Sequence, residues 1–111
     1  METYYKPEHL AGFAGIGAAG SPDLARMFFQ YYGEVFKDGA LTEREKALIA
    51  LAVAHAVQCP YCIDAYSNDA LAKGADLDQM TEAVHVAAAI KGGAALVHGV
   101  QMRNHADKVS M

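Results

Sequence analysis

The feature that most constrains the fold of this chain is a succession of helix-start signals. The signals are Ser21-Pro22-Asp23, the pair Thr42 and Glu45, Cys59-Pro60, and the pair Asp76 and Gln79. A capping residue followed by proline, or by an acidic or amide side chain three positions later, is typical of helix N-termini. No segment shows the sustained alternation of apolar and polar residues that marks a half-buried strand. The sequence therefore predicts an all-α fold.

The spacing of these signals predicts about six helices in a single domain that spans residues 1–111. The expected helical segments are 7–16, which glycines interrupt, 22–36, 42–57, 59–73, 76–91 and 94–105. Gly92-Gly93 is the candidate break between the last two. The third segment is apolar all round after Lys46, so we expect it in the middle of the molecule or in a subunit interface.

Composition and charge give expectations about the oligomeric state, the partners and the location of the protein. Hydrophobic residues make up 53% of the 111 residues, and a domain of this length leaves much of its surface exposed, which favours a homo-oligomer. The formal net charge is −4, with no basic stripe, so we expect no nucleic-acid partner. The longest uncharged apolar run, 47–63, is short for a membrane span, and the N-terminus lacks a secretory pattern. We therefore expect a cytoplasmic protein without a membrane partner.

The two cysteines, Cys59 and Cys62, are three positions apart. A disulfide between them would close almost no loop, so a structural role is a poor interpretation. If Cys59 caps a helix and Pro60 is its first residue, both sulfurs lie near unpaired N–H groups and a partial positive charge. That environment stabilises a thiolate, which is the reactive form. The pattern favours a redox-active dithiol over a metal site or two inert buried thiols.

Two neighbouring side chains have open interpretations. His55 lies one turn before Cys59 and could exchange protons with a thiol or a leaving oxygen, or it could be a core histidine bonded to a backbone carbonyl. Tyr66 lies one turn after Cys62, where its hydroxyl could reach a peroxide, although packing is the simpler interpretation.

A metal site would require more distant ligands. His55 and the cysteine pair could form a Cys2His2 zinc site only with His85 or His98, and this spacing is not that of standard structural zinc sites. We therefore expect neither a metal nor an organic cofactor.

Residues 45–66 resemble the carboxymuconolactone decarboxylase family in its alkylhydroperoxidase, or AhpD-like, branch. The resemblance is carried by Leu48-Ile49-Ala50-Leu51-Ala52-Val53 followed by Cys59-Pro60-Tyr61-Cys62, with later matches at 82–89 and 94–99. The likeness covers roughly 28–105, and the whole chain is similar to a subgroup of peroxidase-like proteins associated with arsenosugar biosynthesis. The resemblance implies an orthogonal helical bundle that assembles into trimers or hexamers.

The resemblance also implies a thiol-dependent chemistry. Family members reduce small hydroperoxides, or pass electrons to a peroxiredoxin, through a cysteine pair that an external thioredoxin- or lipoamide-like dithiol reduces again. By this likeness Cys62 attacks the peroxide and Cys59 resolves the product. Helix-dipole reasoning alone prefers Cys59, so the order of the two stays open.

The chain departs from the family's proton relay at two positions. The family has a glutamate where this chain has Ala47, and a histidine where it has Tyr66; His55 is the nearest candidate for a replacement base. The leading hypothesis is a CxxC-dependent hydroperoxidase. The second is a non-catalytic protein that binds a small molecule or a metalloid such as arsenic(III). Lactone decarboxylation ranks last, because decarboxylase members do not need the cysteine pair.

Overall fold

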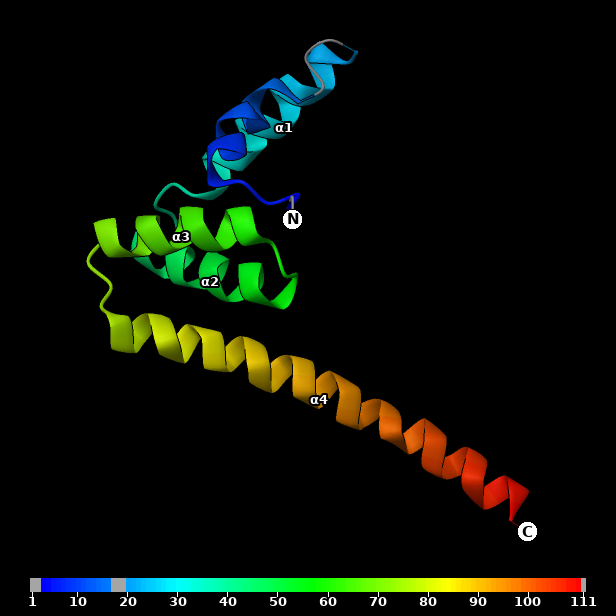
Figure 1. Cartoon of the computed structure of the whole chain (residues 1–111). Helices are drawn as coiled ribbons and strands as arrows, with labels where there is room; N and C mark the ends of the chain where they lie inside the picture. Colours follow the sequence, from blue (N-terminus) through cyan, green and yellow to red (C-terminus); the bar gives the residue numbers. More distant parts are fainter. Residues whose placement is uncertain (1–2, 17–19, 111) are drawn as a thin grey trace.

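The computed structural model describes residues 3–16 and 20–110, and this part of the chain is helical without strands. A 3₁₀ helix, η1 (Pro7–Gly15), precedes four α-helices (Figure 1). The α-helices are α1 (Pro22–Val35), α2 (Glu43–Ala56), α3 (Pro60–Ala72) and α4 (Leu77–Val109). The predicted all-α fold class is confirmed.

The helix-start signals act as the sequence predicts at α2 and α4. At α2 the Glu45 N–H donates to Thr42 Oγ1 at 3.1 Å, while the Thr42 N–H donates to Glu45 Oε1 at 2.9 Å. Asp76 and Gln79 make the same reciprocal pair at the start of α4. Each pair satisfies two backbone donors that the first helical turn would otherwise leave without a partner.

The last two expected helices are one. The chain runs through Gly92-Gly93 without a break, and α4 extends over 33 residues. Glycine in a helix interior costs only about 1 kcal/mol relative to alanine, and unlike proline it retains its N–H donor. The two glycines therefore weaken the helix without ending it, and the predicted break is wrong.

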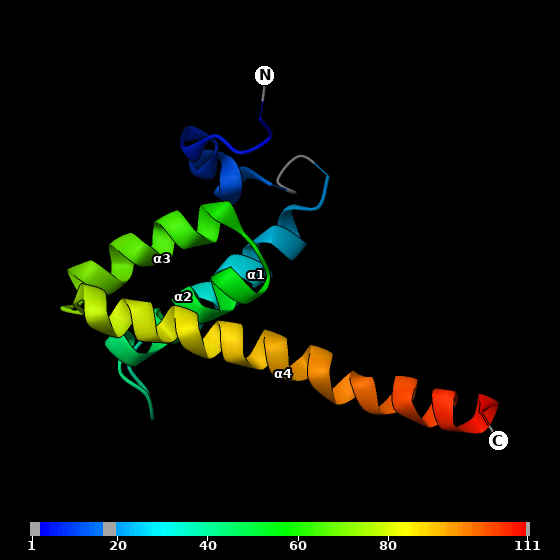
Figure 2. The ribbon, with the colours of Figure 1, turned by 60° about the horizontal axis from the view of Figure 1, so that its bottom comes forward.

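Helix α2 lies between α3 and α4 and contributes most to a small core (Figure 2). Its Ala47, Leu51 and Ala54 are buried, and the core continues through Ala70, Ala75 and Met80. The central position expected for this apolar helix is confirmed for one of its faces. The opposite face, with Ile49, Val53 and Val57, is about half exposed or more in the isolated chain.

Helix α4 projects well beyond the rest of the chain in both views (Figures 1 and 2). The radius of gyration is 18.9 Å, whereas a compact domain of this length has about 13 Å. Large apolar side chains along α4 are exposed, including Ile90 at 68% and Leu96 at 80%. By length and composition alone, α4 would also be long and apolar enough to cross a membrane.

Candidate redox site

The cysteine pair occupies the first turn of α3. Cys59 is the N-cap, with extended backbone angles, and Pro60 is the first helical residue. The N–H of Cys62 donates to Cys59 Sγ at 3.2 Å, and a disulfide joins the two residues, whose Cα atoms are 5.2 Å apart. The sulfurs therefore lie where backbone N–H groups and the helix dipole favour negative charge.

A tight turn connects the end of α2 to the start of α3. Gln58 takes a left-handed conformation with φ of 57°, and the Cys59 N–H donates to the carbonyl of Ala54 at 3.0 Å. This bond closes the end of α2 in the manner of a Schellman motif. The reversal lays α3 against α2 and places the dithiol at the corner between them.

Two cavities border the dithiol. The first, of about 440 Å³, lies among α1, α2 and α3, and its walls include Cys62, Tyr66, Val53 and Ala54. The second, of about 360 Å³, lies beneath η1 and is bordered by both cysteines and by Phe13. Cys62 is thus the sulfur that both cavities reach, whereas Cys59 faces only the second.

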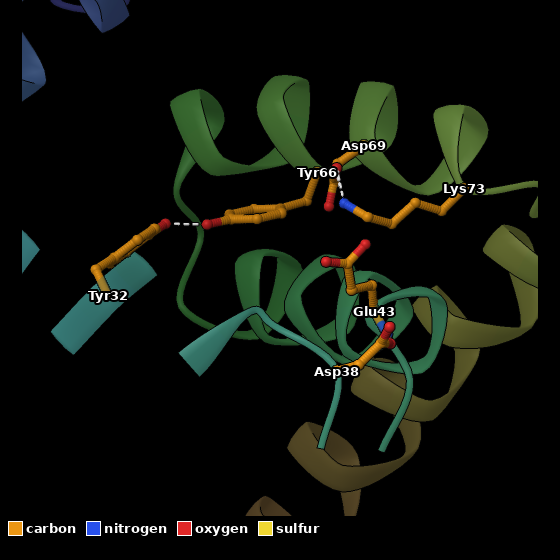
Figure 3. Close-up of polar contacts among 6 residues, drawn as sticks. All are labelled: Tyr32, Asp38, Glu43, Tyr66, Asp69 and Lys73. Atoms are coloured by element: carbon orange, nitrogen blue, oxygen red, sulfur yellow. Dashed lines mark hydrogen bonds and ion pairs between the residues drawn. The ribbon is translucent and has the colours of Figure 1, made fainter. Parts of the chain in front are cut away.

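Tyr66 projects from α3 toward α1 and shares a hydroxyl–hydroxyl hydrogen bond with Tyr32 (Figure 3). Its ring stacks on Phe36, with centroids 5.2 Å apart and planes 21° from parallel. Burial, supported by the hydrogen bond to Tyr32 and by nearby negative charge, raises the pKa of Tyr66 well above its usual value. Tyr66 therefore remains a neutral hydrogen-bond donor at any physiological pH.

A charged cluster occupies the other half of α3 (Figure 3). Lys73 forms an ion pair with Asp69, and Glu43 and Asp38 lie nearby. The hydrogen bond to Asp69 is the main cause that raises the pKa of Lys73, with a smaller contribution from Glu43 and Asp38. These groups border neither cavity at the sulfurs: the Lys73–Asp69 pair is partly buried, and Glu43 and Asp38 are exposed.

His55 lies outside the walls of the two cavities that border the dithiol. Its Nδ1–H donates to the carbonyl of Leu51 at 2.8 Å, as in the core interpretation of this residue, and it borders neither of the two cavities. His85 and His98 lie exposed on α4. Within residues 3–16 and 20–110, no group of three or more His, Cys, Asp or Glu side chains is arranged to hold a metal ion.

Sequence reasoning missed the contribution of α1. Tyr32 and Phe36 reach Tyr66 from a helix that is remote in sequence, and they continue a row of aromatic contacts that starts at Phe13. The available signal was the four-residue spacing of Tyr32 and Phe36, which puts both rings on one helical face. Nothing in the spacing indicated that this face would meet α3.

The fold and the site define an all-helical protein with a CxxC dithiol at a helix N-terminus, bordered by largely apolar cavities. Residues 22–102 match the carboxymuconolactone decarboxylase family, and the chain belongs to that family. A Paracoccus denitrificans protein, described as "Uncharacterized protein 4 in cox locus", is 52% identical over 98 residues, covering 88% of this chain and 87% of that protein.

A solved structure supports the fold. The crystal structure of a protein from Methanobacterium thermoautotrophicum matches with a TM-score of 0.70 and 36% sequence identity, and the match covers 73% of this chain and 91% of that one.

Proposed function

We propose that the protein is a dithiol hydroperoxidase that reduces a peroxide through a Cys59–Cys62 disulfide. The observation that carries this proposal is the position of the pair: the Cys62 N–H binds Cys59 Sγ, and Cys62 borders a largely apolar cavity. Membership of a family that includes such peroxidases is consistent with the proposal.

In the proposed reaction the Cys62 thiolate attacks the terminal oxygen of the hydroperoxide. A sulfur–oxygen bond forms, the oxygen–oxygen bond breaks, and the alkoxide leaves and takes up one proton to become an alcohol. The Cys59 thiol then attacks the Cys62 sulfenic acid, and water leaves as the disulfide forms. Sulfur has lost two electrons and the peroxide has gained them.

The geometry favours Cys62 as the attacking sulfur. Of the two cysteines, Cys62 alone borders the first cavity, which has room for an organic peroxide. The N–H of Cys62 donates to Cys59 Sγ, which stabilises Cys59 as the thiolate that leaves when the disulfide is reduced again. This assignment agrees with the order that the family resemblance implies.

The second cavity provides a separate approach for the reductant. It exposes both sulfurs beneath η1 and includes apolar side chains such as Leu10, Phe13 and Ile16. An external dithiol of the thioredoxin or lipoamide kind would attack Cys62 from this side, and Cys59, the better-stabilised thiolate, would leave. A reducing compartment such as the cytoplasm would supply such a partner.

A single-turnover experiment tests the proposal. The protein is reduced, freed of reductant, and mixed under anaerobic conditions with one equivalent of cumene hydroperoxide. We expect the peroxide to be converted to its alcohol with the loss of both thiols, and the mass of the intact chain to fall by two hydrogens. Unreacted thiols in the presence of intact peroxide would contradict the proposal.

We further propose that the active form is a homo-oligomer in which a second copy covers α4. The exposed side chains of Val86, Ile90, Leu96 and Val97 form an apolar surface that a monomer in water would not retain at low cost. The extended shape of the isolated chain also fits a subunit that is completed by its neighbours.

The proposed homo-oligomer predicts that a charged substitution on the apolar surface of α4 lowers the mass of the particle in solution. We expect light scattering after size exclusion to give a multiple of 11.8 kDa for the wild type, and Leu96→Glu to shift it toward the monomer because a charge would be buried in the contact. The control is Gln101→Glu, which adds the same charge at an exposed polar position of α4. A wild-type monomer, or a protein that requires detergent for solubility, would contradict the assembly.

A further inference from the structure

We infer that Tyr66 protonates the oxygen that leaves during peroxide cleavage, and that Tyr32 holds the Tyr66 hydroxyl in place. This inference rests on the proposed function and assigns a residue to the proton step that the proposal leaves open. Tyr66 is the catalytic residue in this assignment, and Tyr32 is a positioning residue.

The first observation is the shared wall of the first cavity. Tyr66 follows Cys62 by four residues on α3, so the two side chains lie on one face of the helix, and both border this cavity. The Tyr66 ring runs back along α3 toward its N-terminal end, which is the end that carries the cysteines (Figure 3). A peroxide that reaches Cys62 from this cavity therefore meets the Tyr66 side chain.

The second observation is the precision with which the ring is held. Phe36 stacks on one face of Tyr66, and the Tyr32 hydroxyl binds the Tyr66 hydroxyl from α1. A donor that is fixed before the substrate arrives needs little reorganisation when charge develops on the leaving oxygen. Tyr32 also gives Tyr66 a neighbour through which the proton can be replaced.

The third observation is that few polar side chains line the first cavity. Besides Tyr32, Tyr66 and Cys62, the residues that line the first cavity include one polar or charged side chain, Lys46. Its Nζ donates to the carbonyl of Lys37 at 2.5 Å. Lys46 lies in the first turn of α2, and the connection at Gln58 brings the opposite end of α2 next to Cys62. Among the side chains that line the first cavity, the tyrosine pair thus supplies the hydroxyl donors, and Tyr66 lies one helical turn from Cys62.

The proton balance is complete with these groups. As the Cys62 thiolate takes the terminal oxygen, the alkoxide that leaves accepts the hydroxyl proton of Tyr66, and an alcohol and a tyrosinate result. The tyrosinate regains a proton from solvent through the Tyr32 hydroxyl. Burial raises the pKa of Tyr66, yet a phenol remains a much stronger acid than an alcohol, so the transfer to an alkoxide is downhill.

The test compares two oxidants whose leaving groups differ in whether they need a proton. Cumene hydroperoxide releases a strongly basic alkoxide, whereas peracetic acid releases a carboxylate that needs no proton. We expect Tyr66→Phe to slow the oxidation of Cys62 by cumene hydroperoxide about 100-fold, in the range of general-acid effects, and to change the peracetic acid rate by less than about 3-fold. A loss that is equal for both oxidants, or no loss with either, would overturn the assignment.

Further variants separate positioning from folding. Tyr32→Phe should reproduce the selective loss in weaker form, about 10-fold, because the Tyr66 hydroxyl remains but is less well placed. Tyr66→His, which restores a donor, should recover most of the cumene hydroperoxide rate even if Tyr66→Phe folds poorly. Tyr31→Phe, at a 68% exposed position on α1, is the matched control and should leave both rates unchanged. A wild type that reacts with neither oxidant would instead refute the proposed function itself.

Discussion

Replacing Cys62 by serine is expected to abolish hydroperoxide consumption, lowering the rate at least 1,000-fold to that of the uncatalysed reaction with the reductant. A serine hydroxyl is far less nucleophilic than a thiolate, and it cannot be oxidised to a sulfenic acid. Cys59 remains in this variant, but it borders only the second cavity. The measurement is peroxide consumption under excess dithiol, followed for wild type and variant at equal protein concentration.

The matched variant is Cys59→Ser, which should separate the first chemical step from turnover. With Cys62 intact, one equivalent of peroxide should still be consumed, and a dimedone adduct should form on Cys62 because no partner thiol is present to condense with the sulfenic acid. Catalytic turnover should fall to a slow rate that depends on the external thiol. An adduct on Cys59 in the Cys62→Ser protein, with no adduct in the converse variant, would reverse the order of attack.

Much of the fold could be predicted because its determinants are local. A capping box such as Thr42 with Glu45 acts within four residues, and Pro60 can occupy a first turn but not a helix interior. The positions of α2, α3 and the start of α4 follow from such rules. The continuity of α4 through Gly92-Gly93 could not be predicted, because a helix boundary there depends on a balance of about 1 kcal/mol per glycine.

The sequence predicts the part of the candidate site that lies on α3, but not the contacts that other helices make with it. The position of Cys59 as N-cap and of Cys62 in the first turn follows from the sequence pattern. The partners of Tyr66 come from α1, and no local rule states which face of α1 meets α3. For His55, both the core and the functional interpretation fitted the sequence, and its hydrogen bond to Leu51 became visible only in three dimensions.

The two positions at which the sequence departs from the family pattern, 47 and 66, both belong to or contact one core cluster. Ala47 is fully buried in the core cluster, and Tyr66 packs against that same cluster. We expect a carboxylate at position 47 and a tyrosine at position 66 to compete for space in this cluster, because a close-packed core accommodates added volume poorly.

This coupling predicts a large loss of stability for Ala47→Glu. The position is 0% exposed, so the new side chain would overpack the core and bury a carboxylate without a partner, at a cost of about 3–5 kcal/mol. Burial raises the pKa of the introduced carboxyl, so it protonates more readily in the folded than in the unfolded state. The destabilisation should therefore be largest near neutral pH and should decrease as the pH falls toward the ordinary glutamate range.

Urea denaturation followed by circular dichroism at one fixed protein concentration measures this loss. The control Ala72→Glu, at an exposed position in the last turn of α3, should change the free energy of unfolding by less than about 1 kcal/mol. If packing couples the two positions, adding Tyr66→His to Ala47→Glu should recover part of the lost stability, giving a coupling energy of about 1 kcal/mol or more. Additive single effects would show that the tyrosine does not occupy the space that the family's glutamate uses.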